Sequence, residues 1–330
     1  IADPVSPGAR QSRVRAGAAL ASRPPGRRRG DARVPAAGSG DPAFRRLQDG
    51  TTWRATRTPE GPCLLRLVPR AHAGEIEGTA WGAGAAWALD TLPDLLGEGD
   101  DETGFEPRPE HRRLVGAWRL GRGWRVPRSQ AVFEALAAAA LEQVVTGVEA
   151  RRAWRLLVTR YGTPAPGADV TAQGPAAGMV VPPAPEVWAA IPTWEWLRAG
   201  VEERRRRVVQ VAARSASGLE RTLGLAPDRV EPVLRSLPGV GVWTAAEVRQ
   251  RAHGDADAFS WADYHVSRNV SWALTGRVLD DDGCAEVIEC YRGHRYRVQR
   301  LLELSGVQRP RRGPRMRLPT HTPAATGGRS

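Results

Sequence analysis

Residues 226–246 read APDRVEPVLRSLPGVGVWTAA, and the pattern of this stretch predicts a particular pair of helices. The apolar residues Val230, Val233 and Leu234 share one face of a helix predicted over 226–236, and a second helix is predicted over 243–252. Between them, residues 237–241 read LPGVG, in which two glycines flank one apolar residue. Glycine lets a backbone turn tightly without a Cβ clash, so the pattern predicts a helical hairpin with a very short turn.

The start of the second helix is a candidate site for a nucleic-acid backbone. Its first N–H groups lack partners within the helix, and they point outward at the positive helix end, which favours phosphate. We therefore expect DNA contacts from the hairpin residues Pro238, Gly239, Val240, Gly241 and Thr244. The side chain of Val240 is expected to fill the gap between the two helices. An ordinary helical hairpin with a glycine turn is the alternative.

The net charge of +12 lies at the two ends of the chain. Residues 1–40 hold eight Arg and two Asp, residues 309–330 hold six Arg and no acid, and residues 41–308 therefore sum to zero. Both ends lack an apolar period, so we expect 1–40 to be a disordered basic arm and 309–330 a disordered basic tail. A specific DNA site must then come from local geometry in the neutral middle of the chain.

The middle of the chain divides into two predicted domains, and the predicted fold class is mainly α. Residues 41–125 indicate a small α/β domain with an antiparallel sheet, because 52–58 and 64–68 flank a Pro-Gly turn and residues 81–96 are helical in pattern. Residues 126–308 indicate an all-α domain. Its other predicted helices lie near 129–146, 148–160, 186–198, 201–214, 263–275 and 284–304.

Residues 237–245 resemble the hairpin of the helix-hairpin-helix (HhH-GPD) DNA glycosylase superfamily. In that superfamily a catalytic Asp follows the hairpin near the start of another helix, and Asp263 stands there, 22 residues after Gly241. Residues 141–146, LEQVVT, and 291–295, YRGHR, extend the resemblance to the branch of 3-methyladenine DNA glycosylase II of actinobacterial type. The resemblance covers about residues 41–310 and implies the helix-hairpin-helix glycosylase fold.

Asp263 is the candidate catalytic residue. Hydrolysis of an N-glycosidic bond passes through an oxocarbenium-like sugar, and a nearby carboxylate stabilises that charge and can orient water. An Asp at a helix start is otherwise an N-cap, and the two roles are compatible because a helix N-terminus favours the ionised form. Asp255 and Asp257 lie close in sequence and are interpreted as turn residues.

The resemblance also implies a pocket that receives a base flipped out of the DNA stack. Trp243 is expected at the pocket floor, with Trp261 and Tyr264 as further pocket residues or, alternatively, core residues. Gln143 and Val144 are expected to face DNA, and Val144 stands where the superfamily places the side chain that fills the space left by the base. A core position is the alternative for Val144.

Trp243 stands where the lyases of the superfamily carry the Lys that attacks the sugar, and none of the 330 residues is Lys. The chain is therefore expected to lack Lys-dependent lyase activity. The implied function is a monofunctional glycosylase of base excision repair that removes alkylated purines, such as 3-methyladenine and 7-methylguanine, and leaves an abasic site. A glycosylase for hypoxanthine or a mismatched base, and a non-catalytic module that only binds DNA, are the alternatives.

Three cysteines, Cys63, Cys284 and Cys290, suffice neither for a four-cysteine iron–sulfur cluster nor for a zinc site. We expect no cofactor and no metal, with a monovalent cation at the hairpin left open. No apolar run reaches the roughly 18 residues of a membrane span, and no apolar core follows the basic start as a secretory signal requires. We expect a cytoplasmic, nucleoid-associated monomer whose partner is double-stranded DNA with a damaged base.

Overall fold

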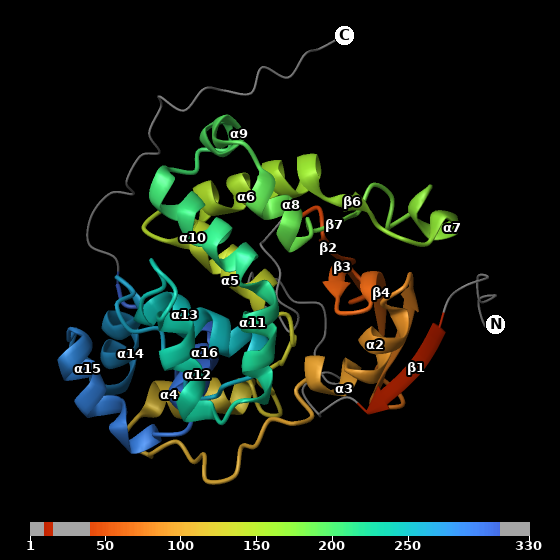
Figure 1. Cartoon of the computed structure of the whole chain (residues 1–330). Coiled ribbons are helices and arrows are strands. Elements are labelled where there is room, and N and C mark those ends of the chain that lie inside the picture. The colour runs from red at the N-terminus through yellow and green to blue at the C-terminus, as the bar shows by residue number, and fades with distance from the viewer. Residues whose placement is uncertain (1–9, 16–39, 311–330) are drawn as a thin grey trace.

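The computed structural model describes residues 10–15 and 40–310. An antiparallel five-stranded sheet, in the order β1-β5-β4-β3-β2, lies beside a larger group of helices (Figure 1). The strands are β1 (Arg10–Arg15), β2 (Phe44–Arg46), β3 (Thr52–Thr58), β4 (Gly61–Arg70) and β5 (Glu75–Trp81). The predicted class, a mainly α fold with a small antiparallel sheet near the N-terminus, is confirmed.

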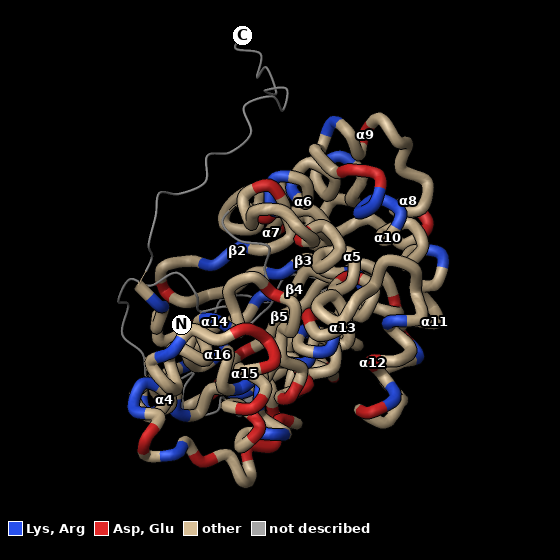
Figure 2. Tube along the Cα trace, turned by 90° about the vertical axis from the view of Figure 1, so that its left-hand side faces the viewer, with Lys and Arg blue, Asp and Glu red and all other residues tan. Residues whose placement is uncertain are grey.

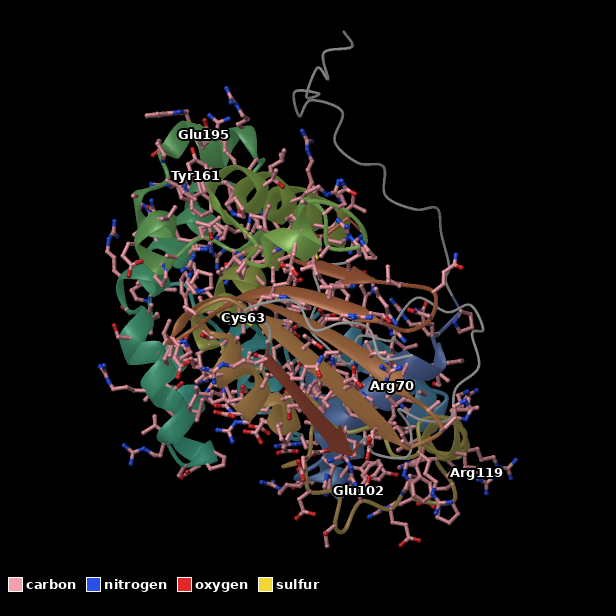
Figure 3. All side chains as sticks on the ribbon, turned by 90° about the vertical axis from the view of Figure 1, so that its right-hand side faces the viewer. Cys63, Arg70, Glu102, Arg119, Tyr161 and Glu195 are labelled. Atoms are coloured by element: carbon pink, nitrogen blue, oxygen red, sulfur yellow. The ribbon has the colours of Figure 1, made fainter. Side chains whose placement is uncertain are left out.

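The predicted hairpin over residues 52–68 is present as β3 and β4, with Ala55 opposite Leu64. Apolar side chains of β4 and β5 pack on the short helices α2 (Ala85–Asp90) and α3 (Leu92–Leu95). Figure 3 looks onto this sheet, with Cys63 near one end of β4 and Arg70 at the other. The helix predicted over 81–96 begins later than expected, because Trp81 is the last residue of β5.

β1 corrects the prediction of a disordered arm over residues 1–40. It pairs antiparallel with β5 along its whole length, from Arg10 opposite Ala80 to Arg15 opposite Glu75. The sequence of this strand, RQSRVR, holds a single apolar residue and therefore no alternating apolar pattern that would predict a strand. The rest of the predicted arm up to residue 39, and the predicted tail from residue 311, lie outside the described residues.

The remaining elements are helices, apart from the short pair β6 (Thr163–Pro164) and β7 (Val180–Val181). Every helix predicted beyond residue 126 is present, although the one predicted over 284–304 is broken in two near Gly293 (φ +91°). The structure adds α4, α7, α11 and η1, which the sequence pattern did not predict. The helices are α4 (Arg112–Leu120), α5 (Val132–Glu142), α6 (Gly147–Tyr161), α7 (Ala168–Thr171), α8 (Pro185–Ala190), α9 (Thr193–Arg198), α10 (Glu203–Arg214), α11 (Ala216–Glu220), η1 (Arg221–Gly224), α12 (Pro227–Arg235), α13 (Val242–Val248), η2 (Arg249–His253), α14 (Val266–Thr275), α15 (Asp281–Ile288), η3 (Glu289–Tyr291) and α16 (Arg295–Ser305).

Two separate hydrophobic cores hold the helices. One lies around α5, α6, α8, α10, α12 and α13, and the other around α4, α14, α15 and α16. Leu114 of α4 and Trp124 belong to the second core together with Phe259 and Val298. The domain boundary predicted at residue 125 therefore cuts through a core, since α4 packs with the C-terminal helices rather than with the sheet.

Basic and acidic positions are interspersed along the described trace (Figure 2). This distribution agrees with the zero net charge of residues 41–308. Within residues 10–15 and 40–310, no helix is long and apolar enough to cross a membrane.

Candidate active site

The turn between α12 and α13 is built by its glycines. Val240 donates its backbone N–H to the carbonyl of Leu237 at 3.0 Å, and Gly239 adopts φ +84°. A Cβ on Gly239 would stand 2.5 Å from Cγ2 of Val208, so both conformation and space require glycine there. A Cβ on Gly241 would instead meet no atom within 4 Å beyond its chain neighbours. The hairpin is thus packed on its inner side and open at Gly241.

The side chains of the hairpin point inward. Val240 is 6% exposed and lies in the core between the helices, as predicted, so only its backbone can meet a ligand. Thr244 is 2% exposed, and its Oγ1 accepts a hydrogen bond from Nε2 of Gln143 at 2.8 Å. The same Nε2 donates to the carbonyl of Gly239 at 3.0 Å. The Thr244 side chain is therefore not available to DNA, so the contact predicted for Thr244 stays a prediction for its backbone alone, and Gln143 holds the end of α5 against the hairpin.

Val144 is the most exposed apolar side chain near the hairpin. It is 91% exposed, which excludes a core position, and its φ of +55° is strained for a β-branched residue. The helix ends on both sides are anchored. Buried Arg205 donates to the carbonyl of Leu141 at 3.0 Å, and Thr146 forms a capping box with Glu149 at the start of α6. Val144 thus projects from a short link between two fixed points.

Asp263 caps α14. Its Oδ1 accepts hydrogen bonds from the backbone N–H groups of His265 at 2.7 Å and Val266 at 3.0 Å. Within the described residues, no hydrogen bond is made to its Oδ2. The preceding Ala262 has φ +63° and donates its N–H to Oδ2 of Asp281 at 2.9 Å, which holds the loop before the cap. One oxygen of Asp263 is therefore fixed by the helix, and the other is left for a ligand.

The two neighbouring acids are structural, in agreement with their interpretation as turn residues. Asp255 forms a salt bridge with Arg249 at 2.7 Å. Asp257 accepts the backbone N–H groups of Gly293 at 2.8 Å and Arg295 at 3.0 Å, at the start of α16. Neither of the two lines the pocket that Asp263 lines.

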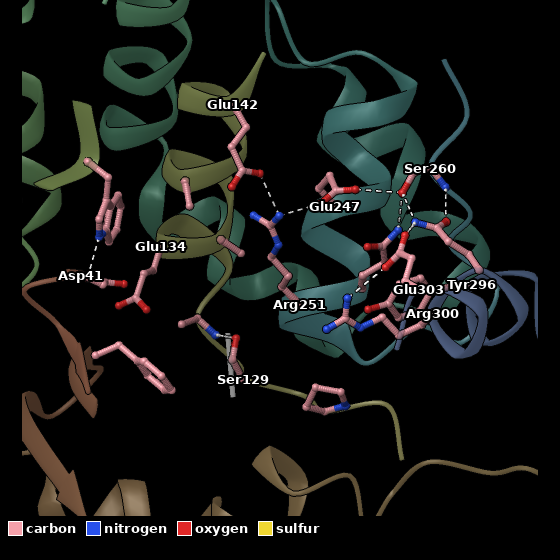
Figure 4. A pocket seen from close by; sticks show the side chains of 18 of the residues that line it. Asp41, Ser129, Glu134, Glu142, Glu247, Arg251, Ser260, Tyr296, Arg300 and Glu303 are labelled. Carbon is pink, nitrogen blue, oxygen red and sulfur yellow. Dashed lines mark hydrogen bonds and ion pairs between the residues drawn. The ribbon is translucent and has the colours of Figure 1, made fainter. Parts of the chain in front are cut away.

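That pocket has a volume of about 390 Å³, within the usual range for small-molecule sites. It lies where the sheet, α5, α13 with η2, and α16 meet (Figure 4). Six acids and three arginines among the lining residues give a formal charge of −3. They are Asp41, Glu134, Glu142, Glu247, Asp263, Glu303, Arg54, Arg251 and Arg300.

Of the three aromatic residues predicted for the pocket, only Trp243 lines it. Trp261 packs on Phe259 with ring centroids 4.3 Å apart and joins the second core. Tyr264 is 69% exposed beneath the guanidinium of Arg268. Neither Trp261 nor Tyr264 thus lines the pocket as predicted. The alternative of a core position is correct for Trp261 and wrong for Tyr264. Four aromatic residues that the sequence reasoning missed line the pocket, namely Phe44, Trp124, Trp154 and Tyr296.

A polar network that the sequence reasoning also missed crosses the pocket wall. Arg251 donates to Oε2 of Glu142 at 2.8 Å and to Oε2 of Glu247 at 2.7 Å. Ser260 donates to Oε1 of Glu247 at 2.8 Å. Burial raises the pKa of Glu247 to about 6, against the opposing pull of Arg251. Glu247 could have been found from its spacing, because it stands one helical turn after Trp243 on the same face.

Comparison with protein-family models and with curated proteins gave no match. Among solved structures, a 3-methyladenine DNA glycosylase from Archaeoglobus fulgidus superposes with a TM-score of 0.63 at 19% identity, over 80% of this chain and 90% of that one. The 8-oxoguanine glycosylase/lyase of Clostridium acetobutylicum bound to double-stranded DNA gives 0.60 at 12% identity, over 82% and 89%. The chain has a DNA glycosylase fold. At identities this low, the likeness establishes the architecture alone, and the chemistry depends on the residues of the site.

Proposed function

We propose that the chain is a monofunctional DNA glycosylase of the 3-methyladenine DNA glycosylase II type, which excises alkylated purines from double-stranded DNA and leaves an abasic site. Asp263 carries the proposal. Its carboxylate lines a pocket together with Trp243, and one of its oxygens is not engaged by the helix that it caps. A purely structural cap would have no need to face such a pocket.

The proposed reaction needs only one carboxylate. After the base has flipped into the pocket, Oδ2 of Asp263 faces the sugar and stabilises the positive charge that develops at C1′. The C1′–N bond breaks, and its electron pair neutralises the cationic alkylated base. Water bonds to C1′ and releases its proton to solvent. No general acid is required, because an alkylated purine departs as a neutral molecule.

The lining of the pocket supports a cationic base. Its formal charge of −3 attracts a positively charged ligand, and Trp243 offers an aromatic face on which a cation stacks well. An uncharged lesion such as 8-oxoguanine or hypoxanthine gains less from this charge. The TM-scores to a 3-methyladenine enzyme and to an 8-oxoguanine enzyme are similar, so another purine lesion is the second candidate substrate. Base release from a panel of lesion duplexes would distinguish the two candidates.

We further propose that the open side of the hairpin at Gly241 receives a DNA phosphate and that Val144 fills the space left by the flipped base. The exposure of Val144 and its strained backbone support this role, since strain persists where it serves a function. A monovalent cation at the hairpin stays a prediction. The carbonyls of Leu237 and Gly239 each already accept one hydrogen bond and keep one lone pair.

Lyase activity is expected to be absent, since none of the 330 residues is Lys. Borohydride reduction during the reaction should then trap no covalent protein–DNA adduct, whereas a bifunctional glycosylase/lyase would be trapped through its Schiff base. A trapped adduct would contradict the monofunctional assignment without contradicting base excision itself.

The decisive test is Asp263→Asn assayed on methylated duplex DNA under single-turnover conditions. The amide oxygen of Asn can accept the same two backbone N–H groups, so the cap on α14 survives while the negative charge is lost. We expect base release to fall by about a hundredfold or more, with DNA binding retained. Unchanged base release would refute the proposal, and DNA binding by a wild-type chain that releases no base would favour the non-catalytic module.

A further inference from the structure

Glu247 is a buried carboxyl that the proposed hydrolysis does not use. It follows Trp243 by four residues, so both side chains leave the same face of the helix, and both line the pocket with Asp263. Glu247 is 9% exposed. A buried charge costs free energy unless it is paired, and perturbed buried carboxyls in a pocket are candidates for function.

The hydrogen bonds around Glu247 define which atoms carry protons. Ser260 Oγ accepts from Nε2 of Gln250 at 2.9 Å and from Nε2 of Gln299 at 3.1 Å, which leaves its single proton for Oε1 of Glu247. Arg251 occupies Oε2 as an obligate donor. Both oxygens of Glu247 therefore face donors and act as acceptors. With a pKa of about 6, the carboxyl is ionised at neutral pH.

This carboxylate has acceptor capacity to spare. Each carboxylate oxygen offers two lone pairs, and each oxygen of Glu247 has one hydrogen-bond partner within the described residues. The part of a ligand that reaches Glu247 is thus met by acceptors and must present donors there. The guanine edge carries N1–H beside the N2 amino group, two parallel donors that match one carboxylate. The adenine edge places its N6 amino group beside N1, which in 3-methyladenine is an acceptor.

We propose that Glu247 determines the specificity of the pocket by accepting hydrogen bonds from N1–H and the N2 amino group of a flipped 7-alkylguanine, which favours that base over 3-methyladenine. The inference rests on the proposed glycosylase function and adds a residue and a preferred substrate to it. Glu142 differs from Glu247 in this network. Arg251 donates to one oxygen of Glu142, whereas both oxygens of Glu247 accept hydrogen bonds. Oε1 of Glu142 has no hydrogen-bond partner within residues 10–15 and 40–310.

The test uses duplex DNA treated with dimethyl sulfate, which contains 7-methylguanine and 3-methyladenine in one sample. Single-turnover rate constants for release of each base are compared between the wild-type chain and Glu247→Gln, whose amide replaces one acceptor oxygen by a donor. We expect the ratio of 7-methylguanine to 3-methyladenine release to fall about tenfold, the usual effect of losing a hydrogen bond to a charged group. Glu142→Gln is the matched control, because it removes the other carboxylate from Arg251 and should leave the ratio unchanged.

The outcomes separate the two claims. An equal fall for both bases in Glu247→Gln, or the same change of ratio in Glu142→Gln, would show that Glu247 only supports Arg251 and would overturn the inference while base excision stands. Release of neither base by the wild-type chain would overturn the proposed function itself, and the inference with it. If Glu247→Gln does not fold, inhibition of the wild-type chain by the free bases decides: 7-methylguanine should inhibit more strongly, and equal inhibition would overturn the inference.

Discussion

The hairpin and the pocket present different chemical groups: the hairpin presents backbone, and the pocket presents side chains. The hairpin turns its side chains inward, as Val240 and Thr244 show, and presents backbone at its open glycine, Gly241. The pocket presents charged and aromatic side chains from the sheet, α5, α13, η2 and α16. A surface made of backbone suits a ligand that repeats along DNA, whereas a surface made of side chains can distinguish one base from another. Under the proposed function, recognition of DNA and recognition of damage are thus carried by separate parts of the molecule.

The two hairpin glycines offer the largest test of this contrast. Gly241→Val places a side chain in the open space where we expect a phosphate, so affinity for duplex DNA should fall at least about tenfold. We expect a loss of about 1 kcal/mol at most in the free energy of unfolding, because valine tolerates the extended backbone of this position although glycine is the better N-cap. Fluorescence anisotropy and thermal unfolding measure the two effects.

Gly239→Ala is the matched control for that variant. The methyl group of this alanine would collide with Val208, and its backbone would have to adopt φ +84°. We therefore expect a loss of about 1–3 kcal/mol in the free energy of unfolding. If Gly241→Val lowers stability as much as Gly239→Ala while leaving DNA affinity intact, the hairpin is a packing element and not a phosphate site.

Val144 follows Glu142, which lines the pocket, and Gln143, which bonds to the hairpin. Val144→Gly should separate the stability of the chain from the proposed role of this side chain. Glycine tolerates φ +55°, so relief of strain offsets the greater freedom of the unfolded chain, and we expect the melting temperature to hold or rise. Flipping a base out of the stack costs a few kcal/mol, and without Val144 no side chain fills the space that the base leaves. The flipped state is then less populated, so base release should fall about tenfold. A variant that is less stable but equally active would contradict the proposed role.

The pH dependence of lesion preference is the smallest expected effect. Burial raises the folded-state pKa of Glu247 from its ordinary 4.5 to about 6. The charge of Arg251 opposes this rise, and the charges of Glu142 and Glu303 add to it. Its acceptor is therefore lost as pH falls through 6, and the ratio of 7-methylguanine to 3-methyladenine release should fall several-fold between pH 7.5 and 5.5. Protonation of Glu247 in that range does not destabilise the fold, since the raised pKa means that the folded state favours the proton.

His253 supplies the control that this measurement needs. Burial lowers its pKa to about 4, so the folded chain keeps this ring neutral. Stability contributed by the neutral ring is present above pH 6.5 and is lost as pH falls from there towards 4. Circular dichroism at each pH separates unfolding from a change of preference, and a ratio that stays constant while the chain remains folded would contradict the role of Glu247.

The sequence predicted those features that depend on local chain direction. The hairpin, the helices around it and the position of Asp263 at a helix start follow from glycine placement and apolar period over short stretches. The pocket lining was predicted only at Trp243 and Asp263. Phe44 and Tyr296 stand more than 250 residues apart, and no local pattern shows that two such residues meet.

Side-chain direction was the second limit of prediction. Trp261 and Tyr264 flank Asp263 in sequence, yet the positive φ of Ala262 turns the chain so that one enters the core and the other faces solvent. Thr244 was predicted to contact DNA because it lies in the first turn after the hairpin, but its side chain is buried and accepts a hydrogen bond from Gln143. Proximity in sequence to a functional residue does not establish proximity to its ligand.

The position of β1 at the edge of the sheet bears on how the protein can be shortened. β1 covers the outer edge of β5, whose backbone groups it pairs from Glu75 to Ala80. A chain that began at residue 41 would leave that edge without its partner strand, and an uncovered edge is a template for pairing with another molecule. Removal of the basic N-terminal segment would thus change self-association as well as charge, so a shortened chain that binds DNA poorly could owe this to aggregation rather than to lost arginines.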